Sequence, residues 1–444
     1  MLAKVELIVN PASGSQLATS LCERDIQPLI LSALSSPSQL SIRRTKCAQD
    51  AVRMGREIIG DYICNVGSKR EYLDLVLVGG DGTTHEILNG FYIAPSPSSD
   101  EGDENVVLPR VRLAIVPAGT ANALYSAMYP SEWTQEVQQK VAAAKTVDQL
   151  SEEVVQIMLS SVRALCNCLK GQEDRSRLHE LPLMLNQLRR EEDEEGERLS
   201  VSHLVTSHAL HASILHDADR QEMRDRYGGI ERFKVAAQLN ATRWIEGSLM
   251  LLPLASSTDE GGGAVLQYSP KSKTFEQLKC GKVELQGPFL YLTTMVTDRL
   301  ESSFIPAPLS CALKGKALPT DAVDVIVIRP TRDPSLNGRD TRKAKLEFAQ
   351  SRLVAITQAM YSGGSHIDLT YDGRESIIEY LRCSGYSFKP EDKGDQEECK
   401  KARLVCTDGF ISSASQTQVR RWTASCTYAL PEGLGRLHAP LIWC

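Results

Sequence analysis

The stretch Leu75–Phe91 of the 444-residue chain reads LVLVGGDGTTHEILNGF. The apolar run Leu73–Val78 predicts a buried strand, and three glycines surround Asp81 directly after it. Glycines leave backbone N–H groups open and let a phosphate approach without a Cβ clash. Thr83, with Glu86 three residues later, fits a capping box for a helix whose positive end would point at the loop. A lone Asp-Gly would indicate only a tight turn, but the whole string after a buried strand favours phosphate binding.

Two further loops follow apolar strands in the same way. Val5–Val9 leads into a loop that begins with Asn-Pro, a common turn opener, and Val111–Val116 leads into the loop PAGTAN. Thr120 and Asn122 of the latter supply possible donors to a nucleotide, although the start of a capped helix explains that loop nearly as well. With a fourth strand at Gln39–Arg43, these short runs alternate with helices and predict a parallel α/β sheet. The three loops would gather at the carboxyl ends of its strands.

Composition excludes several classes of protein. A net charge of −6 argues against a broad basic surface for nucleic acid. The apolar runs are shorter than the roughly 18 residues of a membrane span. Met1–Asn10 contains Lys4 and Glu6 and is typical of a strand rather than of a signal peptide. Twelve cysteines without a CxxC pair indicate reduced thiols rather than disulfides or zinc. We therefore expect a folded cytoplasmic protein.

From about Leu181 the pattern changes to short β-rich segments separated by turns, which predicts a second, mostly antiparallel β-sandwich domain. A single helix, about Leu346–Tyr361, interrupts these segments, and Pro95–Asn105 and Glu191–Glu197 are predicted as surface loops. The predicted division is an α/β domain at 1–135, a helical linker or insertion at 136–180 and a β-sandwich at 181–430. The β-rich segments are Leu181–Leu188, Ser200–Leu215, Trp244–Leu254, Phe289–Val296, Ala322–Arg329 and Arg403–Cys406.

Four histidines, His203, His208, His211 and His216, invite a metal-site interpretation. Their segment has the pattern of a β-strand, and their spacing matches no usual zinc motif. We therefore expect no tight protein metal site among them.

The three loops, in this order and spacing, resemble the diacylglycerol kinase-type catalytic domain that lipid kinases share. Leu75–Phe91 is very similar to that pattern, and VPAGTANAL at Val116–Leu124 resembles its third loop. His208–Phe233 resembles the segment peculiar to sphingosine kinases, in which a strand ends in Asp-x-Asp before basic residues and an Arg-Phe. The resemblance covers most of the chain, from Val5 to about Val419, apart from insertions. It implies an α/β domain of the NAD kinase and diacylglycerol kinase type, followed by a lipid-binding β-sandwich.

The resemblance implies transfer of the γ-phosphoryl group of ATP to the primary hydroxyl of a sphingosine- or sphinganine-type long-chain base. Asp81 would activate that hydroxyl, and Mg²⁺ bound with ATP would lie near Asp81 and Asp408. Asp219, with Asp217, would bind the ammonium or the adjacent hydroxyl of the base, although a solvated helix face with ion pairs is the plainer interpretation from the residues alone. The residues implied to bind nucleotide and phosphate are Asn10, Pro11, Ser13, Gly14, Thr45, Gly79, Gly80, Gly82, Thr83, Gly119, Thr120, Asn122, Arg226, Arg232 and Asp408.

The sequence departs from the family pattern near its end. Phe410 follows Asp408-Gly409 where the family has a glutamate, and Ser213 and His216 replace a glycine and a small residue. These changes keep open a non-catalytic lipid-binding or regulatory relative, and a kinase for ceramide or diacylglycerol is a further alternative. NAD kinase also carries a Gly-Gly-Asp-Gly loop, but the segment Asp219–Arg232 and the long β-rich half argue against it. The expected partners are the lipid, its tail in an apolar pocket between the sheets, and transiently a membrane surface, with no nucleic acid.

Overall fold

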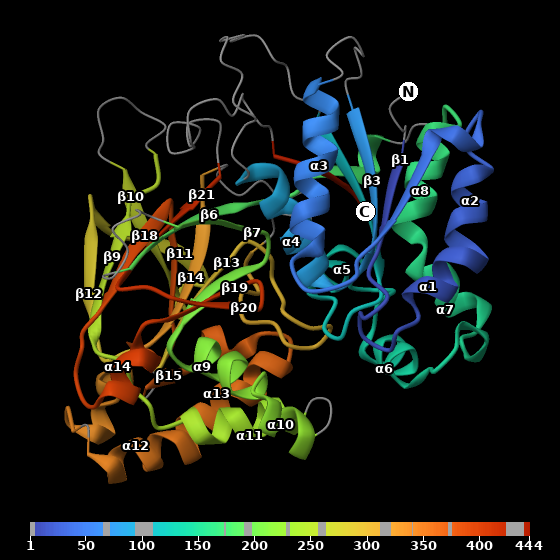
Figure 1. Cartoon of the computed structure of the whole chain (residues 1–444). Coiled ribbons are helices and arrows are strands. Elements are labelled where there is room, and N and C mark those ends of the chain that lie inside the picture. The colour runs from blue at the N-terminus through green and yellow to red at the C-terminus, as the bar shows by residue number, and fades with distance from the viewer. Residues whose placement is uncertain are drawn as a thin grey trace.

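The computed structural model describes residues 5–64, 72–93, 110–172, 175–190, 198–227, 231–255, 263–310, 321–339, 341–371, 375–422 and 439–444. Within them an α/β domain and a mostly antiparallel β domain lie side by side (Figure 1). This arrangement confirms the predicted fold class. The predicted surface loops Pro95–Asn105 and Glu191–Glu197 lie outside the described residues. No helix of the described part is long and apolar enough to cross a membrane.

The N-terminal domain is built on a six-stranded sheet with helices on both faces (Figure 1). The strand order is β2-β1-β3-β4-β22-β5, and all neighbours pair in parallel except β22 with β5. Apolar, β-branched residues form its central strands because both faces are covered. The strands are β1 (Val5–Val9), β2 (Leu40–Arg44), β3 (Tyr72–Gly79), β4 (Arg110–Pro117), β5 (Leu178–Glu180) and β22 (Leu441–Trp443).

The helices of this domain include the segment 136–180, predicted as a linker or insertion. In the structure α8 of that segment packs on β4 and β22, so the segment is a layer of the N-terminal domain. β22 comes from beyond residue 430 and completes the same sheet. The helices are α1 (Ala18–Leu21), a π-helical turn (Cys22–Ile26), α2 (Gln27–Leu31), α3 (Asp50–Cys64), α4 (Asp81–Tyr92), α5 (Ala123–Met128), α6 (Gln135–Ala143), α7 (Glu152–Met158) and α8 (Ser160–Leu169).

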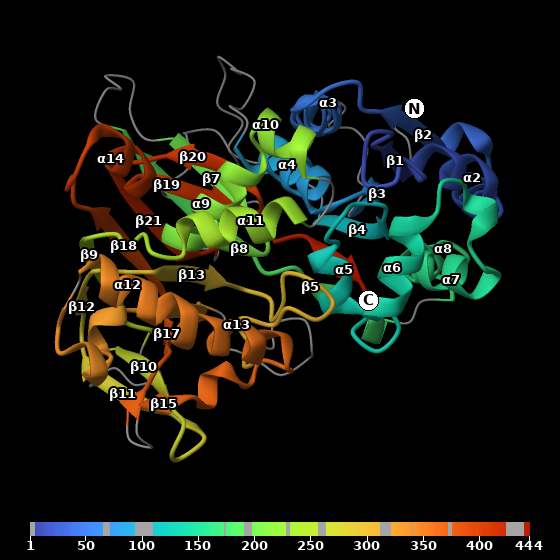
Figure 2. The ribbon, with the colours of Figure 1, turned by 90° about the horizontal axis from the view of Figure 1, so that it is seen from below.

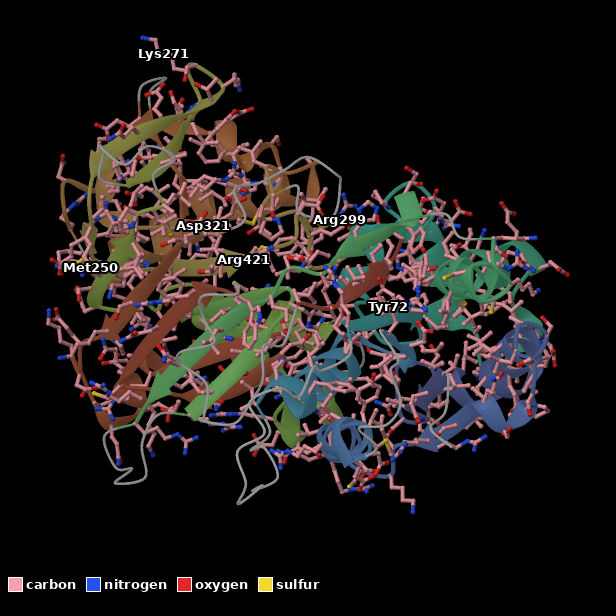
Figure 3. All side chains as sticks on the ribbon, turned by 90° about the horizontal axis from the view of Figure 1, so that it is seen from above. Tyr72, Met250, Lys271, Arg299, Asp321 and Arg421 are labelled. Carbon is pink, nitrogen blue, oxygen red and sulfur yellow. The ribbon has the colours of Figure 1, made fainter. Side chains whose placement is uncertain are left out.

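The C-terminal domain contains an eight-stranded and a six-stranded antiparallel sheet. Along β9, buried Leu249 and Leu251 alternate with half-buried Met250, which lies at the outer edge of the domain in Figure 3. The strands are β6 (Met184–Arg189), β7 (Arg198–Ser202), β8 (Val205–His208), β9 (Gly247–Leu252), β10 (Ala264–Ser269), β11 (Thr274–Cys280), β12 (Val283–Gln286), β13 (Tyr291–Met295), β14 (Val323–Ile328), β15 (Thr370–Tyr371), β16 (Glu375–Ser376), β17 (Glu379–Cys383), β18 (Gly385–Pro390), β19 (Leu404–Thr407), β20 (Phe410–Ser413) and β21 (Gln416–Arg421).

A layer of helices covers one side of the sandwich (Figure 2). One of them corrects the sequence analysis: Ala209–Ala218 is the helix α9, whereas the pattern of Ser200–Leu215 predicted a strand throughout. The chain turns at Ala209, where φ is +53°, and the helix then buries Leu210, Ser213 and Asp217, which are spaced for one helical face. The layer comprises α9, α10 (Gln221–Arg226), α11 (Glu231–Asn240), α12 (Arg342–Phe348), a π-helical turn (Ala349–Leu353), α13 (Val354–Tyr361) and α14 (Gln396–Ala402).

Candidate active site

The three glycine-bearing loops meet at the carboxyl edge of the N-terminal sheet. The side-chain amide of Asn10 donates to Thr83 Oγ1 at 2.9 Å, which joins the first loop to the second. The second and third loops touch through glycine: a Cβ on Gly119 would lie 2.4 Å from the Cα of Gly80. Gly14 closes the first loop onto the third, since its φ is +50° and a Cβ there would lie 2.4 Å from a backbone oxygen of Ala118.

These loops line a cavity of about 340 Å³. Pro11 and Thr45 do not line it, and Asn122 does not either, because its side chain turns back to bond the backbone of Gly119 at 2.8 and 2.9 Å. The lining residues are Asn10, Ser13, Gly14, Gly80, Asp81, Gly82, Thr83, Glu86, Gly119, Thr120, Ala121, Asp408 and Phe410.

The start of α4 faces this cavity without a side-chain cap. The predicted capping box is wrong: Thr83 accepts from Asn10, and the carboxylate of Glu86 instead accepts from the N–H groups of Gln49 and Ala51 at the start of α3. No side chain caps the start of α4, where the N–H of Thr83 donates to the backbone oxygen of Gly80 at 3.0 Å, and the helix dipole favours negative charge there.

Asp81, the first residue of α4, is held by another helix. Its two carboxylate oxygens accept from the backbone N–H groups of Ala123 and Leu124 at 2.9 and 3.0 Å, at the start of α5. Burial raises the pKa of Asp81 above its ordinary value, against the opposing effect of the Leu124 N–H. A carboxylate that is fixed in orientation and more basic than usual is suited to accept a proton.

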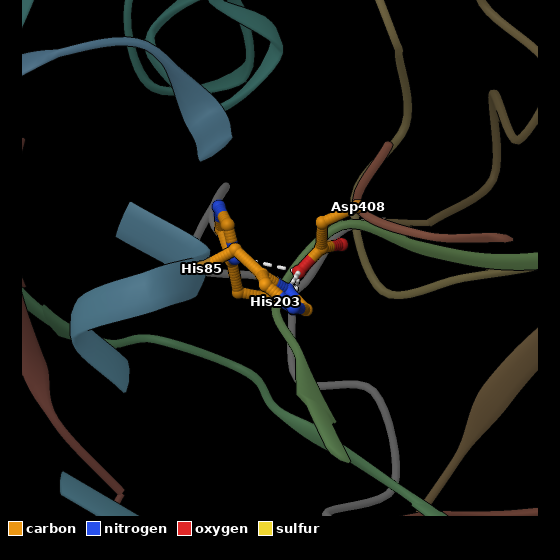
Figure 4. Close-up of side chains that lie close together, drawn as sticks. All are labelled: His85, His203 and Asp408. Carbon is orange, nitrogen blue, oxygen red and sulfur yellow. Dashed lines mark hydrogen bonds and ion pairs between the residues drawn. The ribbon is translucent and has the colours of Figure 1, made fainter. Parts of the chain in front are cut away.

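Asp408 lies in the turn between β19 and β20, with φ of +50°, and its carboxylate is surrounded by donors. Oδ1 accepts from the N–H groups of Leu204 and Val205, and Oδ2 accepts from that of His203. Figure 4 shows the imidazoles of His85 and His203 converging on the same carboxylate, with Nδ1 atoms 2.9 and 2.8 Å from Oδ2. Since His85 belongs to α4, this cluster joins the two domains.

The electrostatics of this cluster are those of a buried ionised pair. Burial opposes ionisation of Asp408, but the charge of His203 and the hydrogen bonds from His203 and His85 hold its pKa far below the usual range. The same pairing raises the pKa of His203, although burial alone would lower it. Each partner therefore favours the charged form of the other.

The donor atoms of His85, His203 and Asp408 all lie within 4.8 Å of one another, as in a metal centre. In the structure both Nδ1 atoms lie within 3 Å of Oδ2 of Asp408, which also accepts the backbone N–H of His203. The expectation that Mg²⁺ bound with ATP lies near Asp81 and Asp408 stays a prediction, and both residues line the first cavity. Sequence reasoning missed the cluster because His85 and Asp408 are 323 residues apart.

Phe410 forms a wall of the site where the family pattern has a glutamate. Its ring stacks on the imidazole of His85 with centroids 4.5 Å apart and 18° between the planes. The ring also covers Gly82, at which a Cβ would lie 3.7 Å from it. An apolar surface therefore stands where a charged carboxylate was expected.

On the other side of this wall lies a second cavity, of about 540 Å³. It shares Gly82, Asp408 and Phe410 with the first cavity, so the two are adjacent. Asp219, at the end of α9, lines it with a half-exposed carboxylate. The remaining lining residues are His216, Arg220, Gly409 and Ile411.

The other predicted acceptor-site residues lie differently. Asp217 is buried and binds Asn240 at 2.8 Å, His216 at 2.8 Å and Lys401. Although burial opposes it, the hydrogen bonds from Asn240, Lys401 and His216 lower the pKa of Asp217 to about 2. Asp217 thus anchors α9 to α11 and α14 rather than lining the second cavity.

The two predicted phosphate-binding arginines do not line either cavity. Arg226 is exposed over the ring of Tyr227, and Arg232 lies over Phe233 and 3.8 Å from Asp219. Arg220, which sequence reasoning did not single out, is the basic side chain that lines the second cavity. Its only sequence signal is its position directly after Asp219.

His208 and His211, two of the four histidines considered for a metal site, each have a separate partner. His208 Nε2 lies 3.1 Å from the hydroxyl of Tyr386, and His211 Nδ1 lies 2.6 Å from that of Ser207. Burial lowers the pKa of His208 to about 3 and that of His211 to about 4, so both are neutral imidazoles inside the C-terminal domain.

Comparison with protein families finds a similarity in the N-terminal part of the chain. Residues 4–158 match the family model of the diacylglycerol kinase catalytic domain. The matched segment includes all three loops, Asp81 and His85. It supports a kinase-type phosphotransferase domain in this part of the chain.

The individual proteins and structures that match the chain have low identity or low coverage. Human sphingosine kinase 2 is 32% identical over 122 residues, which are 28% of this chain and only 16% of that protein. Two solved structures from Bacillus anthracis str. Sterne that carry the name diacylglycerol kinase are each 14% identical to this chain. Both matches cover 95% of this chain. They cover 93% and 94% of the respective solved chains, with TM-scores of 0.48 and 0.43. The structure of yeast NADH kinase complexed with NADH is 9% identical to this chain. The match covers 95% of this chain and 81% of that structure, with a TM-score of 0.31.

Proposed function

We propose that the chain is an ATP-dependent lipid kinase that phosphorylates the primary hydroxyl of a sphingoid long-chain base such as sphingosine or sphinganine. The observation that carries this proposal is the pair of adjacent cavities, one beside the uncapped start of α4 and one lined by Asp219, which share Gly82, Asp408 and Phe410. Phosphoryl transfer needs the phosphate donor and the acceptor hydroxyl next to each other, and adjacent cavities would hold them so. Asp81 directly precedes Gly82, one of the three residues that both cavities share.

The first cavity fits the phosphates of ATP. Its glycines bring backbone close to the ligand, and side chains at Gly80 or Gly119 would collide with the facing loop. Mg²⁺ bound with the nucleotide would neutralise phosphate charge, and it would lie near Asp81 and Asp408, whose carboxylates line the cavity. Asp81, anchored by two N–H groups of α5, would accept the proton of the attacking hydroxyl.

The second cavity would hold the polar end of the lipid. A sphingoid base carries an ammonium group beside its hydroxyls, and Asp219 offers that cation a charge-assisted contact. Asp219 now pairs with Arg224 at 3.1 Å and Arg232 at 3.8 Å, with about half of its side chain exposed. Such exposed pairs contribute little, so an ammonium can replace them.

The lipid tail and the membrane belong to the same proposal. The tail would extend from the second cavity toward the apolar interior of the C-terminal domain. Because sphingoid bases dissolve in membranes, we propose a cytoplasmic protein that associates with membrane surfaces peripherally.

A side-by-side assay tests the choice of substrate. The chain is incubated with ATP, Mg²⁺ and sphingosine, ceramide or diacylglycerol, each in detergent micelles, and phosphorylated lipid is quantified. We expect sphingosine to be the preferred substrate and Asp219→Asn to remove that preference. Phosphorylation confined to the uncharged lipids would contradict the sphingoid-base assignment and leave the kinase assignment intact.

A neutral lipid acceptor is the second candidate, and the arginine pairs of Asp219 favour it. If Arg224 and Arg232 keep the carboxylate neutralised, diacylglycerol or ceramide would meet no uncompensated charge. The substitution by Phe410 similarly motivates a lipid-binding relative without activity. That alternative predicts lipid binding with no phosphorylated product from any of the three lipids.

A further inference from the structure

All four large apolar side chains that are exposed among the described residues lie on one layer of helices. They are Leu239 on α11, Leu346 on α12, and Val354 and Tyr361 on α13, with exposed fractions of 64%, 43%, 46% and 46%. Figures 1 and 2 show α11, α12 and α13 as neighbours on the outer side of the sandwich. Single exposed apolar residues are ordinary, but a group gathered on one face indicates a surface for contact. We call these four residues the apolar helix face.

The last part of the helix that carries three of them, α13, has no charged residue on its exposed side. α12, the π-helical turn and α13 follow one another without a break over residues 342–361. Five of the eight residues of α13 are exposed, and none of them is charged: Val354, Ala355, Thr357, Gln358 and Tyr361. Water-facing helix surfaces normally carry charged side chains. The buried side of the same helix already packs into the domain core, through Phe348, Ile356 and Met360.

The beginning of this helix is basic. Residues 342–361 contain four basic residues and one acidic residue, so their net charge is +3 in a chain whose net charge is −6. Arg352 is committed to Asp333 at 2.9 Å, and Lys345 lies over the ring of Trp244. Arg342 and Lys343 are exposed, and Lys343 meets Glu347 only at 3.9 Å. An uncharged apolar stretch preceded by basic residues is the chemistry of a helix that lies on an anionic lipid surface.

We propose that the helix 342–361, together with Leu239, docks on an anionic membrane. The apolar helix face would enter the interface, and Arg342 and Lys343 would meet the headgroups. The proposal rests on the proposed function in that the substrate is dissolved in that membrane. α11 packs against α9, which ends at Asp219, so the docking helices are in contact with the helix that lines the second cavity.

The features of this face favour lipid over a second copy of the chain. A stable dimer interface buries about 800 Å² on each partner around a well-packed apolar centre. The apolar helix face instead consists of four partly exposed side chains distributed over three helices. Its excess of positive charge would also have no complement in an identical partner face.

Co-sedimentation of the full chain with vesicles tests the docking directly. We expect binding to vesicles of phosphatidylcholine and phosphatidylserine, weaker binding to phosphatidylcholine alone, and loss of binding at high salt. Val354→Glu and Leu346→Glu should each lower the ratio of bound to free protein about tenfold, because a carboxylate must enter the interface in place of an apolar group. Asn167→Glu, which adds the same charge at an exposed position of α8, should bind as the wild type does. Melting temperatures establish that each variant is folded.

The outcomes separate docking from catalysis. Equal vesicle binding by Val354→Glu, Leu346→Glu and the wild type would overturn the docking proposal. A second contradicting result would come from sedimentation velocity: the wild type forms a dimer that Val354→Glu dissociates, and the wild type does not bind vesicles. The vesicle assay needs no ATP and is therefore independent of catalysis. If Val354→Glu weakens vesicle binding but the wild type phosphorylates no lipid, only the proposed function is rejected. Phosphorylation of sphingosine in micelles without vesicle binding would reject docking alone.

Discussion

Gly80 and Gly119 illustrate how much of the candidate site depends on single residues. Their backbones pass so closely that a Cβ on Gly119 would lie 2.4 Å from the Cα of Gly80, with backbone rather than a flexible side chain in the way. The second and third loops can therefore line one cavity only if both positions lack a side chain. Sequence reasoning identified these glycines as phosphate-binding, and the structure adds that they are also contacts between loops.

Gly119→Ala should therefore separate the two loops. We expect a loss of about 2–3 kcal/mol in the free energy of unfolding, as for other overpacked positions, and at least tenfold weaker ATP binding. Gly60→Ala is the matched control, because Gly60 lies in α3 with nothing within 4 Å of its added Cβ, and it should stabilise the protein slightly. Urea unfolding and nucleotide titration provide the two measurements. Normal ATP affinity in Gly119→Ala would show that the loops do not act together.

At the scale of elements, helices in this site are capped by side chains from other helices. Asp81 of α4 binds the first N–H groups of α5, and Glu86 of the same helix binds those of α3. One short helix thereby fixes the orientation of two others around the cavity. A local sequence rule assigned Glu86 to its own helix, since a capping box depends only on spacing.

Glu86→Ala should lower the free energy of unfolding by about 1–2 kcal/mol, the usual cost of removing a helix cap. The reason is that the N–H groups of Gln49 and Ala51 lose their acceptor at the start of α3. Glu132→Ala, which removes an exposed carboxylate before Trp133, is the control and should change stability by less than about 0.5 kcal/mol. Equal stability of the two variants would mean that water replaces the cap without cost.

Some helices and strands could be predicted from the sequence and others could not. Strands β1 to β4 could be predicted from their apolar runs, and so could most of the helix at 342–361, which the sequence predicts as about Leu346–Tyr361. Ala209–Ala218 could not, since a short apolar run fits both a buried strand and a buried helix. The positions of Asp217, Arg226 and Arg232 depend on how α9, α10 and α11 pack, and no spacing along the chain contains that information.

For the whole molecule, the central feature is the junction between the domains. His85 reaches Asp408 from α4, and Asn89 of the same helix bonds both backbone groups of Val201 on β7, at 2.8 and 2.9 Å. Asp408 also accepts the backbone N–H of His203, at the start of the turn between β7 and β8. The sequence showed neither contact, because each joins segments more than one hundred residues apart. The junction keeps the two cavities adjacent, which is what transfer between them requires.

The ionisation of Asp408 makes this junction dependent on pH. Because its pKa is far lower in the folded protein, its contribution to stability is present above its ordinary value of about 4 and is lost as the pH falls below it. His203 acts in the opposite sense, because its pKa is raised in the folded protein. Its contribution to stability is present at low pH and is lost as the pH rises through the pKa that His203 has in the folded protein. Asp408→Asn should lower the free energy of unfolding at pH 7 by about 3 kcal/mol.

Urea unfolding at pH 7, 5 and 3 checks this prediction. Between pH 5 and 3 the wild type should lose about 1 kcal/mol more stability than Asp408→Asn, since only the wild type has this carboxyl to protonate. Parallel losses in the two proteins would show that Asp408 does not stabilise the junction through its charge.

The most direct test of the central claim is the initial rate of ATP-dependent phosphorylation of sphingosine by the wild type and by Asp81→Asn. Asparagine keeps the size of the side chain but cannot accept the proton of the hydroxyl. We predict a clear rate for the wild type and a rate lower by about two to four orders of magnitude for the variant, with ATP affinity within about threefold of the wild type. Equal rates in the two proteins, or no phosphorylated sphingosine from either, would contradict the account.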